Sequence, residues 1–204
     1  PYRMTPEERE VMDDLKRSFC QSPQLRRHIE FLYAVGSVYL KMNDNLLFHG
    51  CVPLTEDGQM EEVNFFGQFL RGKSYFEFCE KAARLAYNTG EARYVDFMFY
   101  LWGGPKSPMC GRVVKTFERS YLDDKASWKE PQDPYYLFLD SEATSRMILR
   151  EFGLKSDLSH IINGHTPVHA SAGENPPSAP TMRTTRALVT VRRTARIDCI
   201  RSPS

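Results

Sequence analysis

Apolar residues recur at helical spacing in two stretches near the start of the chain. Thr5, Pro6 and Glu8 precede the first stretch, and they have the residue types of a capping box with a proline at the first helical position. This pattern predicts a helix that runs to about Cys20. A second helix is predicted to begin near Pro23, with one apolar face formed by Leu25, Ile29, Leu32, Val35 and Tyr39.

Two short apolar runs predict buried strands, and each is followed by a histidine beside a glycine. Residues 46–48 lead to His49 and Gly50, and residues 158–163 lead to Gly164 and His165. Glycine lets the backbone turn sharply at such a position. Ligands of open α/β sheets bind beyond the carboxyl ends of the strands. We therefore expect His49 and His165 to project from strand ends into a pocket.

The remaining pattern completes an α/β fold. A helix is predicted to begin at Ser74 and to end at Asn88-Thr89-Gly90, and another covers residues 140–152 with Gly153 after it. The aromatic run 95–102 is expected to be buried, although its period does not separate helix from strand. Two stretches are expected to be loops, residues 53–72 and residues 106–134.

Charge divides the chain into two parts. The formal net charge is only +1, yet residues 176–204 contain six arginines and a single acidic residue. We expect a body, residues 1–175, and a basic Arg/Thr-rich tail, residues 176–204, that is disordered or out of frame. The five scattered cysteines favour a reducing cytoplasm, and no apolar run approaches the roughly 18 residues of a membrane span.

The residues alone leave several chemistries open for the two histidines. Neutral imidazole is the commonest metal ligand, but a buried histidine is more often a hydrogen-bonded core residue. A Ser-His-Asp site is weaker, because no G-x-S-x-G elbow is present. A nucleophilic pair of Cys51 and His49 is weaker still, because the two residues flank a glycine. There is no Walker loop and no G-x-G-x-x-G motif.

Several blocks resemble one family, the class III fructose-1,6-bisphosphatases of the calcineurin-like metallophosphatase superfamily. The resemblance covers about residues 2–176, in the same order as in the family. Its blocks are Asn45-Leu46-Leu47-Phe48-His49-Gly50-Cys51-Val52-Pro53, residues 97–105, Ser107-Pro108, Thr116-Phe117-Glu118-Arg119, Lys129-Glu130, Asp133-Pro134-Tyr135-Tyr136 and residues 159–168.

This resemblance implies a fold, a substrate and a metal. The chain would be part of a calcineurin-like layered sandwich, and the enzyme would be cytoplasmic and act in gluconeogenesis. It would hydrolyse the 1-phosphate of fructose 1,6-bisphosphate with two divalent ions, Mn²⁺ by expectation, about 3.5–4 Å apart with a bridging hydroxide. His49 and His165 resemble the two later histidine ligands. Arg119 is similar in position to an arginine that contacts the substrate phosphate.

Other basic residues are assigned more ordinary roles. Lys106 and Lys115 are expected to be solvated loop lysines, although a second phosphate is an alternative partner. His28 is expected on a helix surface, and His160 is expected to be structural. His169 does not match the G-H-x-H spacing of the superfamily, so no metal role is transferred to it.

Two departures from the family pattern shape the functional expectation. The early Asp-x-His, Gly-Asp-x-x-Asp and Gly-Asn-His blocks are absent, so the chain resembles a fragment without the N-terminal half, and we expect it to be inactive alone. After Pro176 the expected apolar strand is also missing. The alternatives are another calcineurin-like phosphatase and a non-catalytic module that binds polyanions through the arginines of the tail, although nucleic acid is an unlikely partner.

Overall fold

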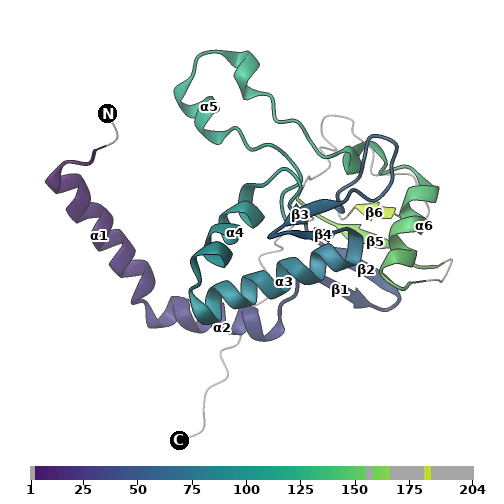
Figure 1. The fold of residues 1–204 in the computed structure, drawn as a ribbon, viewed down its shortest axis with the longest axis horizontal. Helices are drawn as coiled ribbons and strands as arrows, with labels where there is room; N and C mark the ends of the chain where they lie inside the picture. Colours follow the sequence, from purple (N-terminus) through teal and green to yellow (C-terminus); the bar gives the residue numbers. More distant parts are fainter. Residues whose placement is uncertain (1–2, 155–157, 166–181, 185–204) are drawn as a thin grey trace, which may run out of the picture. The chain divides into compact units, whose positions relative to one another are not determined.

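The chain divides into two compact units, which are described separately. The computed structural model describes residues 3–154, 158–165 and 182–184. Unit 1 is Pro1–Ser37 and unit 2 is Val38–Ser204 (Figure 1). The sequence did not predict this division. Among the described residues, no helix combines the length and the apolar character needed to cross a membrane.

Unit 1 consists of two helices, α1 (Pro6–Cys20) and α2 (Pro23–Val35). The predicted capping box is confirmed, because the Glu8 amide donates to Thr5 Oγ1 at 3.2 Å and the Thr5 amide donates to Glu8 Oε2 at 2.8 Å. The second helix ends at Val35, earlier than the stripe to Tyr39 predicted. Neither helix buries a side chain, so capping rather than packing defines them.

The main sheet of unit 2 is mixed and has the strand order β1-β2-β5-β6. β1 pairs with β2 antiparallel, whereas β2 pairs with β5, and β5 with β6, in parallel. This arrangement confirms the α/β class. The bounds are β1 (Tyr39–Met42), β2 (Asn45–Phe48), β5 (Ile161–Asn163) and β6 (Met182–Thr184).

Two of these strands were not expected from the sequence. β1 includes Tyr39, which the sequence assigned to a helix, and Asn43 and Asp44 form its turn into β2 with φ of 49° and 62°. Asn and Asp tolerate this left-handed region, which a two-residue hairpin turn requires. β6 lies in the part of the chain for which no strand was predicted. The rest of the tail, residues 176–181 and 185–204, lies outside the described residues.

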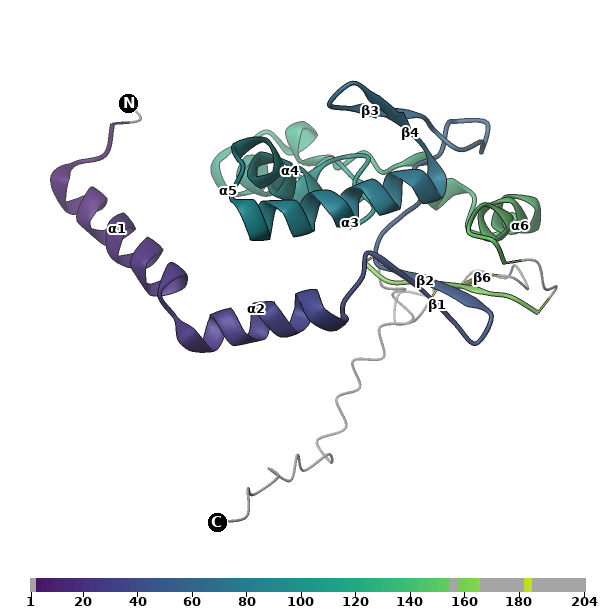
Figure 2. The same ribbon diagram turned by 60° about the horizontal axis from the view of Figure 1, so that its bottom comes forward.

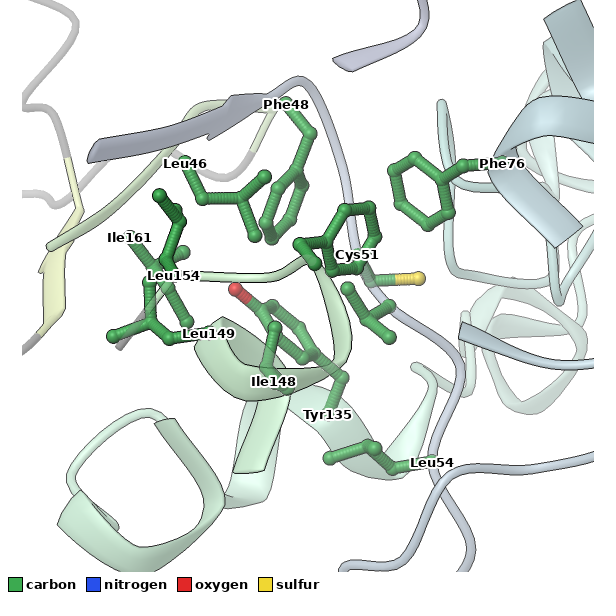
Figure 3. Close-up of a cluster of buried hydrophobic side chains, with 12 residues drawn as sticks. Leu46, Phe48, Cys51, Leu54, Phe76, Tyr135, Ile148, Leu149, Leu154 and Ile161 are labelled. Carbon is green, nitrogen blue, oxygen red and sulfur yellow. The ribbon is translucent and has the colours of Figure 1, made fainter. Parts of the chain in front are cut away.

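One face of the sheet packs against helices and forms the larger core. Figure 2 shows α3 (Gly72–Thr89) and α6 (Glu142–Glu151) on the same side of β1 and β2. The rings of Phe48 and Phe76 meet edge to face, with centroids 5.7 Å apart. The cluster, drawn in Figure 3, contains Leu46, Phe48, Cys51, Val52, Leu54, Phe76, Tyr135, Ile148, Leu149, Phe152, Leu154 and Ile161.

A second core lies between α3, a hairpin and α4. β3 (Val63–Phe65) pairs with β4 (Gln68–Leu70), where the sequence predicted only a loop. α4 is Ala92–Gly103. The start of α3 also differs from the prediction, because Ser74 lies inside the helix and its hydroxyl bonds the backbone of Arg71. The buried members of this cluster are Val63, Tyr75, Cys79, Ala82, Phe97 and Leu101.

The aromatic run is a helix, and it is not buried as a whole. Phe97 and Leu101 of α4 are buried, but the side chains of Phe99 and Trp102 are 70% and 65% exposed. A helix has two faces, and only the face toward α3 and the hairpin is covered by described residues. The expectation that the whole run is buried was therefore wrong.

A buried carboxylate holds the loop region of residues 106–134 to the first core. Asp133 Oδ1 accepts from the Leu54 amide at 3.1 Å and from the Tyr135 amide at 2.9 Å. Its Oδ2 accepts from Lys106 Nζ at 3.1 Å, and Lys106 also bonds Glu61. Lys106 is thus part of a structural ion pair, not a solvated loop lysine. Asp133 precedes η2 (Pro134–Leu137).

Candidate metal centre

The two predicted histidines meet at one edge of the main sheet. β2 and β5 lie side by side in parallel, with Leu46 opposite Ile161, so their carboxyl ends coincide. His49 Nε2 lies 3.0 Å from His165 Nδ1, and the ring centroids are 5.0 Å apart. The two nitrogens are at hydrogen-bond distance, and the tautomers of the two rings decide which of them donates. Residues 116 positions apart in the chain therefore form one side-chain pair.

Backbone contacts hold the two strand ends together. The Gly164 amide donates to the carbonyl of His49 at 2.9 Å, and Asn163 Nδ2 donates to the carbonyl of Gly50 at 3.1 Å. The Gly50 amide in turn donates to the carbonyl of Pro108 at 2.9 Å. These three bonds fix the backbone positions of the two strand ends from which the imidazoles project.

Only one of the two glycines is required for close backbone approach. A Cβ at Gly50 would lie 2.7 Å from the carbonyl oxygen of Pro108, which is too close for any side chain. A Cβ at Gly164 would meet its nearest atom at 3.7 Å, an ordinary contact. Close backbone approach therefore requires a glycine at position 50 and not at position 164.

His165 has an unusual backbone and an unsatisfied side chain. Its φ is 60°, in the left-handed region that non-glycine residues adopt infrequently and often at functional sites. Its Nε2 is buried and has no hydrogen-bond partner among the described residues. A buried imidazole nitrogen without a partner is costly, so this atom marks a position where a further group is expected to bind.

Electrostatics favour the neutral form of His165. Partial burial lowers its pKa, and the nearby charges of Arg112 and His49 lower it further. A neutral imidazole is the form that binds a metal ion, because metal and proton compete for the same lone pair.

The separation of the two facing nitrogens is also compatible with two ligands of one divalent ion, provided that both nitrogens are free of a proton. Two nitrogens that each lie about 2.1 Å from a metal, at a right angle to one another, are about 3.0 Å apart. However, no group of three or more His, Cys, Asp or Glu residues among those described is arranged to hold a metal ion. The described residues therefore supply two neighbouring histidines and no complete metal site.

The structure places Arg119 apart from the histidine pair. Arg119 lies on the short helix α5 (Thr116–Tyr121), which Figure 1 draws away from the ends of β2 and β5. Its side chain is 53% exposed. Its Nε and Nη2 both donate to the carbonyl of Trp128 at 3.3 Å. The phosphate role predicted for Arg119 stays a prediction.

The other histidines take the ordinary roles expected of them, as far as they are described. Lys115 differs from expectation, because it forms an ion pair and is not a solvated loop lysine. His28 is exposed on α2. His160 is structural, because its amide donates to Asn45 Oδ1 at 3.0 Å. Lys115 Nζ pairs with Glu118 at 2.7 Å. His169 lies outside the described residues.

Sequence reasoning missed one charged residue beside the pair. Arg112 acts electrostatically on His165, and its Nη1 lies 3.5 Å from Glu130 Oε2. The sequence indicated only that residues 106–134 form a long irregular stretch, and such a stretch in a compact domain is often functional. It did not identify which basic residue of that stretch acts on the histidines.

A family model described as Firmicute fructose-1,6-bisphosphatase matches residues 1–185. The chain belongs to this family. The match includes both histidines and Arg119, and it extends past Asn175 through β6. The membership that the sequence blocks suggested is thereby confirmed.

Curated relatives agree with the family assignment and are much longer. The chain is 47% identical over 182 residues to a fructose-1,6-bisphosphatase class 3 of Clostridium botulinum (strain Kyoto / Type A2), covering 86% of this chain and 27% of the relative. A fructose-1,6-bisphosphatase class 3 of Clostridium acetobutylicum is 46% identical with the same coverage. The chain thus spans about a quarter of the length of these relatives. No solved structure matches it.

Proposed function

We propose that the chain is part of a metal-dependent phosphatase that hydrolyses the 1-phosphate of fructose 1,6-bisphosphate. The membership of the fructose-1,6-bisphosphatase family supports this proposal. The observation that carries the site is the contact between His49 Nε2 and His165 Nδ1 at 3.0 Å, at the sheet edge where α/β proteins bind ligands. The fold around this edge is proposed to be part of a calcineurin-like layered sandwich.

In this proposal His49 and His165 are metal ligands, and Mn²⁺ is the proposed ion. When bound, a divalent metal pair supplies a nucleophile at neutral pH and stabilises charge on the phosphoryl oxygens. The residues of this chain orient and bind: β2 and β5 hold the imidazoles, and Gly50 lets the loop that contains Pro108 approach them. The surroundings of His165 lower its pKa and favour the neutral imidazole. Arg119 is proposed to bind a phosphate group of the bisphosphate with its planar guanidinium group.

The isolated chain is proposed to be inactive. Two imidazoles can hold a metal ion only weakly, and a bridged metal pair needs carboxylate ligands as well. The catalytic unit in this proposal is the full-length family protein that contains this segment. Detection of metal-dependent phosphate release by the isolated chain would contradict the proposal.

The test measures phosphate release from fructose 1,6-bisphosphate by the full-length protein after chelation and addition of Mn²⁺. His49→Ala and His165→Ala are expected to lower kcat/KM on the order of 100-fold or more, because loss of a ligand exceeds the effect of losing a residue that only supports one. His28→Ala is the matched control, since His28 is exposed on α2. Equal activity of all three variants would exclude the histidine pair from the reaction.

A further inference from the structure

Two arginines share the carboxylate of Glu130. Glu130 Oε2 lies 3.5 Å from Arg112 Nη1 and 3.6 Å from Arg119 Nη2. Its side chain is only 13% exposed, and its Oε1 accepts from the Lys115 amide at 3.0 Å. The carboxylate is thus fixed by the backbone, and it holds both guanidinium groups in the same place.

The carboxylate of Glu130 does not satisfy all the hydrogen-bond donors of the two guanidinium groups. A charge-assisted bond between a guanidinium group and a carboxylate is about 2.7–2.9 Å long, and both contacts are longer. Arg112 Nε is buried and has no hydrogen-bond partner among the described residues. With Lys115 and its partner Glu118, the cluster has three cationic and two acidic side chains. Because cationic side chains outnumber acidic ones in this cluster, it has the charge to bind a further anion.

Backbone pairing attaches the cluster to the histidine pair. Arg112 and Gln132 form an antiparallel bridge, flanked by bonds from the Asp133 amide to the carbonyl of Gly111 at 2.8 Å and from the Val113 amide to the carbonyl of Pro131 at 2.9 Å. Gly111 packs so tightly on Cys51 that a Cβ would lie 2.5 Å from its sulfur. Cys51 is two residues after His49, so Arg112 lies at the edge of the site.

Arg119, the second arginine on Glu130, makes no described contact with either histidine. The cluster therefore extends from the segment that packs on Cys51 outward to α5.

We propose that Arg112 and Arg119, held against Glu130, bind the second, non-reacting phosphate of a sugar bisphosphate whose reacting phosphate lies at the histidine pair. The inference rests on the proposed phosphatase function, and it assigns the preference for a bisphosphate over a monophosphate to these arginines. A guanidinium fork matches phosphate oxygens bidentately.

The test compares two substrates in the full-length protein with Mn²⁺. Fructose 1,6-bisphosphate has two phosphates, and p-nitrophenyl phosphate has only the reacting one. For Arg112→Ala and Arg119→Ala, the ratio of kcat/KM for the bisphosphate to that for the monoester is expected to fall roughly tenfold or more, the size expected for loss of one charged hydrogen bond. The loss is expected mainly in KM for the bisphosphate.

Arg17→Ala is the matched control, because Arg17 is an exposed arginine paired with Asp14 on α1. Arg112→Lys and Arg119→Lys keep the charge without the fork, and they are expected to restore part of the ratio. They also serve as the test where an alanine variant does not fold.

The outcomes separate this inference from the proposed function. A ratio equal to that of the wild type, whether both rates fall or neither does, overturns the role of the arginines while the phosphatase function stands. A wild-type protein that hydrolyses the bisphosphate no better than the monoester, or hydrolyses neither, overturns the proposed function itself. A ratio that falls in both arginine variants and not in Arg17→Ala supports the inference.

Discussion

The two compact units differ both in how their helices begin and in what their helices bury. α1 has a full capping box and a proline at its first turn, yet none of its side chains is buried. α3 has no side-chain cap of the usual kind, yet it buries Tyr75, Phe76, Cys79, Ala82 and Ala86. Caps decide where a helix begins, and tertiary packing supplies most of its stability. Substitution of the same residue type should therefore change the free energy of unfolding by very different amounts in the two units.

The largest expected difference is between two phenylalanines. Phe76→Ala removes a fully buried ring from the larger core and should lower the free energy of unfolding by about 3–5 kcal/mol. Phe19→Ala removes an exposed ring from α1 and should change it by about 0.5 kcal/mol or less. Urea unfolding followed by circular dichroism measures both. Similar losses in the two variants would show that unit 1 has a packed core after all.

The next difference is between a buried and an exposed carboxylate. Asp133 accepts from two backbone amides and from Lys106, and Asp133→Ala leaves all three donors without that acceptor. The expected loss is about 3 kcal/mol. Asp14 pairs with Arg17 on the surface of α1, so Asp14→Ala should cost at most about 1 kcal/mol. A small loss for Asp133→Ala in the same urea experiment would mean that water replaces the missing oxygens.

The glycines beside the two histidines provide a finer comparison within unit 2. In Gly50→Ala the new methyl group collides with the carbonyl of Pro108, and backbone must move at an expected cost of about 1–3 kcal/mol. Gly164→Ala has room for the methyl group and should stay within about 0.5 kcal/mol of the wild type. The thermal midpoints of the two variants, measured side by side, test this. The opposite order would show that Gly164 is the glycine on which the site depends.

Features encoded by neighbouring residues were predictable from the sequence. Thr5 and Glu8 specify the start of α1 within one turn, and the apolar runs before His49 and His165 predict β2 and β5. Parallel pairing of the two strands then places both histidines at one edge. The meeting of the histidines was thus a consequence of pattern and topology together.

Features that depend on distant partners were not predictable in the same way. The hairpin of β3 and β4 is only three residues per strand, and its turn places Phe66 at a φ of 54°, which is uncommon for an aromatic residue. The exposed ring of Phe99 shows that apolar sequence predicts a tendency to be buried, not the partner that covers it. Arg112 is brought to His165 by the packing of Gly111 on Cys51, which no local pattern encodes.

The smallest expected effect is a change in how stability depends on pH, and it compares a histidine from each unit. In the folded chain partial burial, Arg112 and His49 hold the pKa of His165 below its ordinary value, so the unfolded chain binds this proton first as the pH falls. The stability of the metal-free chain should therefore decrease as the pH falls through about 6.5. His165→Asn, which keeps a residue that tolerates a positive φ, should remove part of that decrease, whereas His28→Asn on α2 should not. Urea midpoints at about pH 7.5 and about pH 5.5 in the presence of a chelator measure the two slopes. An unchanged slope in His165→Asn would mean that other groups cause the acid sensitivity, and that the environment of His165 does not disfavour its charged form.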